Sequence, residues 1–179
     1  IWAVNNIVDK VFLEKYLNKI GAVVILVGLT NFVAFFVLVL FFGMPLFSLT
    51  DSLILIGSGV LLIIDYLPYL KALTMEDVSR VIPLYQTIPL FVLIISFILL
   101  GESFSTKSFF GFLIVLIGTV LISLEKLDLT VFKLRPCFWY MILASFVYSL
   151  SVVLFKFVAV GDNTIGAFTL VILGCGIGS

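Results

Sequence analysis

The sequence predicts an all-α integral membrane protein, a multi-span helical bundle with no separate soluble domain. Of its 179 residues, 63% are hydrophobic and only 11% are charged, whereas soluble domains carry about 25% charged residues. A helix needs about 20 apolar residues to cross a bilayer. Five long runs contain no charged residue: Ile20–Thr50, Val81–Gly101, Ser108–Leu124, Pro136–Phe155 and Asn163–Ser179.

These runs predict helices, because lipid offers the backbone no hydrogen-bond partner and the strands of membrane barrels are only about 10 residues long. The formal net charge is zero, which argues against nucleic acid as a partner. The chain has no histidine, the commonest metal ligand and general base. We therefore expect no metal, no cofactor and no enzyme activity.

Short polar breaks divide the chain into seven expected spans. The first, Ile1–Val11, starts inside an apolar stretch, and the last runs from about Thr164 to the end of the sequence. We therefore expect a fragment cut within a helix at each end. Short connections favour packing of neighbouring spans as antiparallel hairpins. The other five spans are expected at about Ile20–Phe42, Ser52–Leu70, Val81–Leu100, Ser108–Leu124 and Cys137–Val158.

Two pairs of identical residues suggest an internal repeat. Lys10 and Lys156 are 146 residues apart (156 − 10), and so are Gly28 and Gly174 (174 − 28). Equivalent spans are an odd number of spans apart, so they run antiparallel across the membrane. This is the plan of the inverted repeats in many secondary transporters, and it predicts a complete chain of about 290 residues and ten spans.

The charges of the connections indicate an orientation. The connections after the first, third and fifth spans hold seven lysines and arginines, whereas those after the second, fourth and sixth hold only Lys107. Cytoplasmic loops carry the excess of positive charge. This asymmetry places the first set of connections in the cytoplasm.

Several residues in the central spans form a pattern of order and spacing. Pro89 lies inside the fourth span, Gly101 and Glu102 follow its end, Gly111 and Gly118 lie in the fifth span, and the chain starts with IWAVNNIVDK. This pattern resembles the EamA-type domain of the drug/metabolite transporter superfamily. The start resembles the end of that family's first helix.

The resemblance implies two inverted five-helix repeats around a central cavity. Residues 1–134 would form the first repeat and residues 135–179 the start of the second. Members of this superfamily move amino acids, metabolites, nucleotide sugars or phosphorylated sugars, often outward. Well-known members have both termini in the cytoplasm, opposite to the orientation that the loop charges indicate, so the orientation stays open.

Lysines in two expected spans are candidates for substrate binding. Lys156 follows 20 uncharged residues, and it shares a helix face with Ser149, next to Tyr148. A lysine within a span usually faces a cavity or a partner, although one at the membrane edge can extend its charge to the interface. Lys10 and Asn6, four residues apart, form the matching wall in the first span, or simply a helix end. Lys10 and Lys156 together predict a preference for anionic groups.

Asp65 and Tyr69 are four residues apart near the expected end of the third span. A carboxylate there can bind a proton or a substrate amine. The sequence favours a different interpretation, in which Asp65 is interfacial beside a helix end kinked at Pro68, with Tyr66 and Tyr69 in the aromatic belt.

The fourth span combines polar groups with a proline. Pro89 lacks an N–H and leaves the carbonyl of Tyr85 without its helical partner, so we expect a kink there. Pro89, Tyr85 and Gln86 fit a gating helix with a binding surface, and packing alone is about as good an explanation. Glycines that share a helix face allow close helix approach. We expect this packing role for Gly111 and Gly118 in the fifth span, and for Gly57 and Gly59 in the third.

These observations favour a secondary transporter of a small polar metabolite in the cell or inner membrane, working by alternating access. Its partners would be that solute and membrane lipids, and a homodimer is compatible with the glycine faces. One alternative is a flippase for a lipid-linked sugar. The other is a membrane protein that transports nothing.

Overall fold

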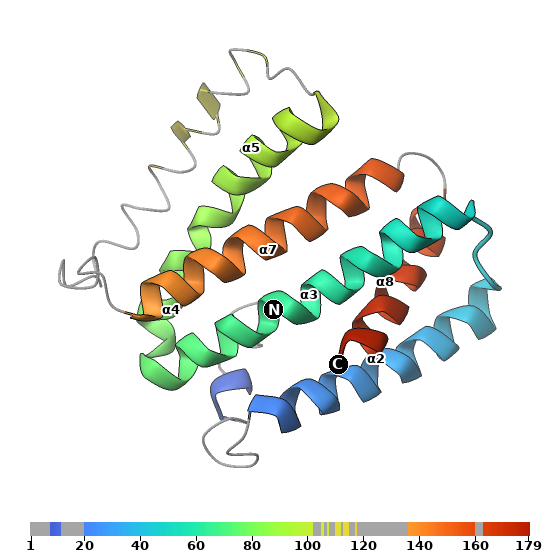
Figure 1. Cartoon of the computed structure of the whole chain (residues 1–179), viewed down its shortest axis with the longest axis horizontal. Coiled ribbons are helices and arrows are strands. Elements are labelled where there is room, and N and C mark those ends of the chain that lie inside the picture. The colour runs from blue at the N-terminus through green and yellow to red at the C-terminus, as the bar shows by residue number, and fades with distance from the viewer. Residues whose placement is uncertain are drawn as a thin grey trace.

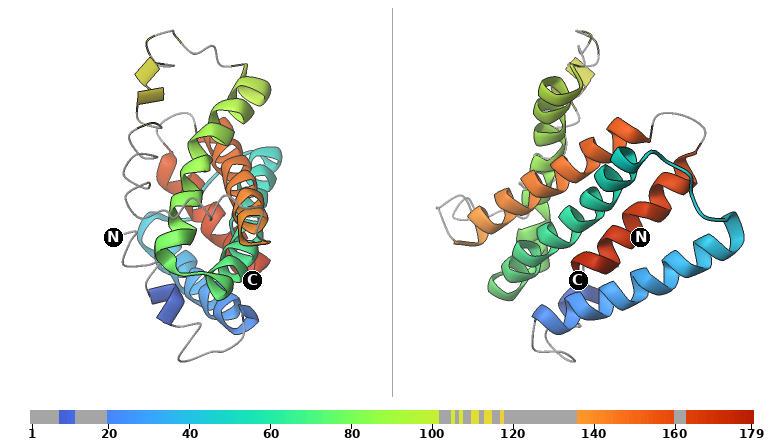
Figure 2. Two further views of the ribbon diagram at one scale, coloured as in Figure 1. Left: turned by 90° about the vertical axis from the view of Figure 1, so that its left-hand side faces the viewer. Right: turned by 45° about the vertical axis from the view of Figure 1, so that its right-hand side comes forward.

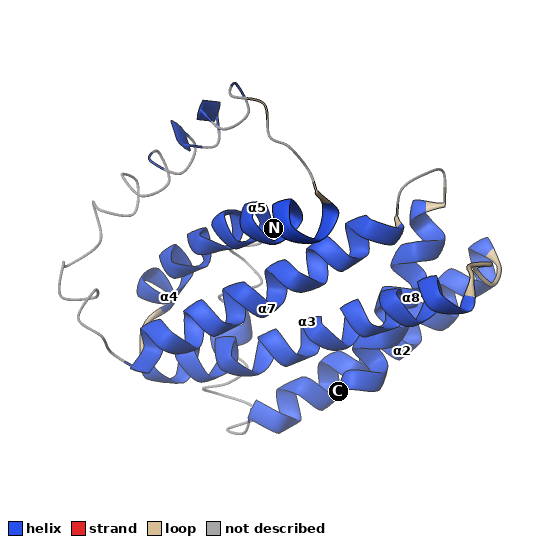
Figure 3. Ribbon diagram, turned by 45° about the horizontal axis from the view of Figure 1, so that its top comes forward, coloured by secondary structure: helices blue, strands red, loops and turns tan. Residues whose placement is uncertain are grey.

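The computed structural model describes residues 8–11, 20–101, 105, 107, 110, 111, 113, 114, 117, 136–159 and 163–179, and the helices found there confirm the predicted all-α fold. Residues 8–11 are helical, and no strand occurs in these ranges (Figure 3). The longer elements are α2 (Ile20–Phe42), α3 (Leu49–Met75), α4 (Val78–Leu84), the 3-10 turn η2 (Tyr85–Thr87), α5 (Ile88–Leu100), α7 (Pro136–Val158) and α8 (Thr164–Gly178).

The helix ends follow from local sequence. α2 stops at Gly43, whose φ of 80° is accessible to glycine, and α5 stops at Gly101 with a φ of 64°. Ser48 caps α3, because its hydroxyl oxygen accepts a hydrogen bond from the backbone N–H of Asp51 at 3.1 Å. α3 exceeds the expected Ser52–Leu70 at both ends and continues through Pro68.

Within the described residues, three helices are long and apolar enough to cross a bilayer: α2, α3 and α7. Two shorter apolar helices accompany them, Tyr85–Leu100 and Thr164–Gly178. Large apolar side chains are exposed along α2, such as Leu40 at 82% and Phe41 at 77%, as expected for a surface in contact with lipid tails. The expected spans Ile1–Val11 and Ser108–Leu124 lie largely outside the described residues.

α3 is the central helix, and it packs mainly against α7 and α8 (Figure 1). Cys137 lies beside Ala72, and Ser151 donates a hydrogen bond to the carbonyl oxygen of Ser58 at 2.8 Å. Numbers on α7 therefore rise as those on α3 fall, so the two helices are antiparallel.

α8 lies between α2 and α3, as Figure 2 shows from a second direction. The predicted hairpin packing of neighbouring spans is therefore wrong for α2 with α3 and for α7 with α8, which touch each other little. Contact area decides this order, because α8 offers glycines to both of its neighbours and the connections are long enough to permit the insertion.

Gly59 and Gly174 bring α3 and α8 into backbone contact. A Cβ on Gly59 would overlap the carbonyl oxygen of Val171, and a Cβ on Gly174 would overlap that of Ile56. The thiol of Cys175 donates to the carbonyl oxygen of Gly59 at 3.3 Å. The glycines thus replace side chains with direct packing and weak polar contacts, whereas Gly57 has no atom within 4 Å of a built Cβ.

Candidate functional site

Asp65 is a carboxylate buried within the helix bundle. It is only 4% exposed and lies about 15 Å from the Met75 end of α3, at 1.5 Å per residue. A hydrocarbon core of about 30 Å, centred on this helix of about 40 Å, would place Asp65 about 10 Å inside the apolar layer. The helix end expected near Pro68 is wrong, because α3 continues through Pro68 to Met75.

Tyrosines surround Asp65 and link it towards a second carboxylate. The Tyr85 hydroxyl donates to Asp65 Oδ2 at 3.5 Å, and the Tyr85 ring stacks on Tyr69 with centroids 5.2 Å apart. Tyr69 and Tyr66 both donate to Asp9, at 3.4 Å and 2.8 Å. The sequence assigned Tyr66 and Tyr69 to the aromatic belt. The spacing of four residues between Asp65 and Tyr69 already placed these two residues on one helix face.

The helix that carries Tyr85 is interrupted at this point. Pro89 lies in the first turn of α5, and η2 separates this helix from α4. Proline has no N–H to donate to the carbonyl of Tyr85. The N–H of Ile88 donates to that carbonyl instead, with the tighter 3-10 spacing. The helix therefore narrows to a 3-10 turn beside Asp65 without an orphaned backbone carbonyl at Tyr85.

α7 completes the group with Ser145, Tyr148 and Ser149. Ser145 and Ser149 are fully buried, and the Ser149 hydroxyl lies 2.6 Å from the carbonyl oxygen of Ser145 and 3.1 Å from that of Ile88. Tyr148 is close enough to Asp65 for an electrostatic interaction. Ser149 therefore holds α7 against the interrupted helix.

The Ser145 hydroxyl has no hydrogen-bond partner among the described residues. By the register of α3 on α7, Asp65 lies level with Ala144, next to Ser145. Ser145 also lies one helical turn before Tyr148. An unpaired buried hydroxyl costs about 1–3 kcal/mol of stability, so the Ser145 hydroxyl is destabilising unless a ligand pairs with it.

Lys10 closes the end of the cluster at the C-terminus of α3. Its Nζ donates to the carbonyl oxygens of Leu73 at 2.7 Å and Glu76 at 3.1 Å. Carbonyls in the last turn of a helix lack intrahelical partners and carry partial negative charge. Lys10 thus fixes the helical residues 8–11 to α3 and neutralises this helix end.

Replacing Lys10 by Met is expected to lower stability by about 1 kcal/mol, because a half-buried charge-assisted pair of hydrogen bonds is lost. Thermal unfolding in detergent measures this effect. Lys71→Met, at an exposed position of α3, is the matched control and should leave the midpoint unchanged. Equal midpoints for both variants would contradict the tethering role.

Lys156 does not join this cluster. It lies exposed in the last turn of α7, and the register places it level with Leu53 of α3. Lys10 lies beside Leu73, so the two lysines are separated by about 30 Å along α3. The structure does not bring the two lysines together around one anionic group, because they lie near opposite ends of α3.

The other predicted site residues are spread more widely. Gln86 is exposed, whereas its neighbour Tyr85 points into the bundle. Gly111 is exposed, with no atom within 4 Å of a built Cβ, so the expected close packing is not seen there. Asn6 and Gly118 lie outside the described residues.

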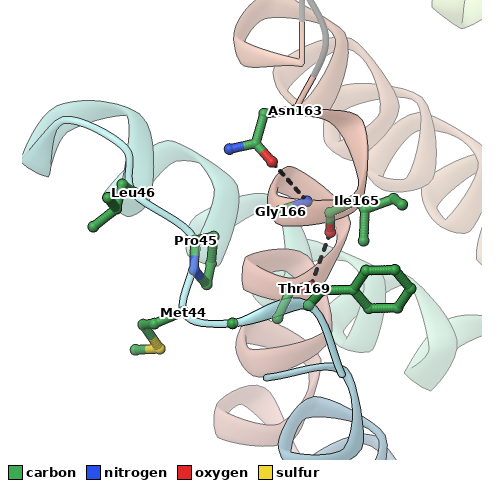
Figure 4. Close-up of a pocket in the computed structure, with 9 residues that line it drawn as sticks. Met44, Pro45, Leu46, Asn163, Ile165, Gly166 and Thr169 are labelled. Atoms are coloured by element: carbon green, nitrogen blue, oxygen red, sulfur yellow. Dashed lines mark hydrogen bonds between the residues drawn. The ribbon is translucent and has the colours of Figure 1, made fainter. Parts of the chain in front are cut away.

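A pocket of about 350 Å³ lies at the other end of the bundle, between the α2–α3 connection and the start of α8 (Figure 4). Its polar groups serve the helix itself. Asn163 Oδ1 accepts from the N–H of Gly166 at 3.2 Å, and Thr169 donates to the carbonyl of Ile165 at 2.9 Å. No predicted site residue lines this pocket, and it is separate from the Asp65 cluster.

The apolar helices of membrane-spanning length define the class of integral membrane proteins. The profile of the EamA-like transporter family matches residues 1–124. The chain therefore belongs to this family, which confirms the resemblance and makes it a membrane transporter of small molecules, with membrane lipids around it. The family consists of transporters and not of enzymes. No curated protein and no solved structure matches the chain.

Proposed function

We propose that this protein is a multi-pass secondary transporter that moves a small polar metabolite across the cell or inner membrane by alternating access. The observation that carries the proposal is the interrupted helix α4–η2–α5 beside buried Asp65. Transporters commonly form their binding sites near the bilayer midplane from discontinuous helices. Substrate-binding residues are then Asp65, Tyr85, Tyr148 and Ser149.

The polar groups follow a line from the bundle interior to one membrane face. Asp65 lies inside the apolar layer, Asp9 further along, and Lys10 at the end of α3. Lys71 also lies near this end, and positive charge favours the cytoplasmic side. This line supports a solute path between the Asp65 cluster and the cytoplasm.

The contact between α2 and α8 supports the division into inverted repeats, residues 1–134 and 135–179. With the offset of 146, α8 is the counterpart of α2, and the two pack antiparallel, with Gly28 beside Ser179. Inverted repeats require counterpart spans to run antiparallel across the membrane, as this pair does.

Counterflow in proteoliposomes tests the proposal. Vesicles with purified protein are loaded with one unlabelled solute from a panel of neutral amino acids, amines, phosphorylated sugars and nucleotide sugars, and uptake of the labelled solute is followed. Saturable exchange of one solute, absent from empty vesicles, is the expected result. If folded protein exchanges none of these solutes, the proposal that it carries a solute of one of these classes is wrong.

Pro89→Ala is expected to slow turnover about tenfold with little change in KM. Alanine supplies an N–H that can donate to the Tyr85 carbonyl with α-helical spacing, in place of the 3-10 bond from Ile88, and this favours a straight helix by about 1 kcal/mol. This gain favours one conformation over the other and so raises the barrier to alternation, while the binding groups stay in place. Initial counterflow rates over a range of concentrations separate the two constants.

Pro45→Ala, in the connection before α3, is the control for a proline outside the gate. If Pro89→Ala turns over as fast as the wild type, the interruption between α4 and α5 has no role in the transport cycle.

A further inference from the structure

We propose that the Asp65 cluster binds a single positive charge, supplied by a proton or by the ammonium group of the solute. This inference deepens the proposed function and rests on it, because it names the chemistry that the same site takes. It replaces the anion preference predicted from the two lysines. The argument uses the burial of Asp65, its neighbours and the Ser145 hydroxyl.

Among the residues that the structure describes, no cation balances buried Asp65. In the described part of the chain no lysine or arginine forms an ion pair with Asp65, and Lys10 is held by the α3 carbonyls about 12 Å further along that helix. Isolated charges in an apolar environment are very costly. A bound positive charge removes this cost.

The groups of the packed elements that interact electrostatically with Asp65 are hydroxyls and a thiol. They are Tyr66 and Tyr69 of α3, Tyr85 of η2, Tyr148 of α7 and Cys175 of α8. Asp9, the next charged group along the cluster, is itself acidic. None of these groups carries a positive charge, so the surroundings of Asp65 favour a cation and oppose an anion.

Ser145 adds a second polar group at this level of the bundle. Its hydroxyl is fully buried, unpaired among the described residues, and lies on α7 level with Asp65. A serine hydroxyl both donates and accepts hydrogen bonds, so it can accept one from a protonated carboxyl group or from an ammonium N–H. It brings no charge that would balance Asp65.

Infrared difference spectroscopy on the purified protein in lipid tests the proposal without any transport step. The carbonyl band of a protonated carboxylic acid is followed as pH is changed, in H₂O and D₂O. Methylammonium chloride is the amine probe, added at fixed pH, with potassium chloride as the salt control. Asp65→Asn is compared with Asp51→Asn. Asp51 is another aspartate of α3 and lies in its first turn.

A carboxylic acid band that titrates would support the site if it is kept in Asp51→Asn and lost in Asp65→Asn. If methylammonium leaves this band unchanged, the ligand is the proton. Loss of the band on adding methylammonium, or methylammonium binding weakened at least tenfold by Asp65→Asn, identifies the ammonium group. Tyr85→Phe is a second variant and should shift the band, because a donor to the carboxyl group is removed.

Absence of both an Asp65-dependent band and Asp65-dependent methylammonium binding, in protein that keeps its helical circular dichroism, would overturn the inference. Because no solute gradient is involved, this result stays separate from a failure of counterflow. Counterflow with no charge bound at Asp65 would leave the transporter intact and refute only the site chemistry.

Discussion

Gly59→Ala is expected to destabilise the protein by about 3 kcal/mol or more, near the upper end of the cost of overpacking a core. The new Cβ would overlap the carbonyl oxygen of Val171 and approach the backbone N of Cys175 to 2.8 Å. Backbone atoms cannot rotate away as a side chain does. α3 and α8 must therefore separate, which also removes the hydrogen bond from the Cys175 thiol to Gly59.

Gly57→Ala is the matched control, two residues away on the same helix. A Cβ there has no atom within 4 Å, and alanine favours a helix over glycine by about 1 kcal/mol. Thermal unfolding in detergent should therefore show a large fall for Gly59→Ala and no fall for Gly57→Ala. Gly174→Ala should resemble Gly59→Ala. Similar midpoints for the two α3 variants would refute the backbone contact.

Asp65→Asn is expected to reduce counterflow about 10- to 100-fold, the range that follows from losing a charged hydrogen-bond partner worth about 1.5–3 kcal/mol. Asparagine keeps the size of the side chain but cannot take up a proton or balance an ammonium group. The fall should appear in transport and not in stability, since a buried carboxylate without a cation is itself a cost to folding.

Asp51→Asn controls for the removal of an aspartate from α3 and should transport as wild type, with at most a small loss from its contact with Ser48. Asp65→Glu keeps the chemistry and should retain part of the activity. Full transport by folded Asp65→Asn would exclude this carboxylate from the cycle.

Most helix boundaries could be predicted from the sequence, because the cost of placing charges in lipid delimits each span. α2 begins and ends as expected, and α7 begins one residue early. α3 differs because polar residues at both of its ends, such as Asp51 and Lys71, still fit the helix outside the apolar layer. A proline such as Pro68 removes one hydrogen bond but does not have to end a helix.

The order of the helices could not be predicted, and neither could the composition of the site. Hydropathy shows that α2, α3 and α8 face lipid or protein, but not which of them are neighbours. The sequence indicated Asp65 and Tyr85 as separate candidates, and their contact depends on the break at η2. Asp9 and Tyr66 join the cluster through packing between segments 57 residues apart in the chain.

The position of α8 between α2 and α3 also sets a schedule for biosynthesis. Cys175 and Gly59 meet although they are 116 residues apart in the chain, and ribosomes add about 5–20 residues per second. For about 6–23 seconds, α2 and α3 are therefore in the membrane before the helix that joins them has been made. During this interval the glycine face of α3 is available to lipid or to other proteins, and quality-control factors have their best chance to recognise an unfinished chain.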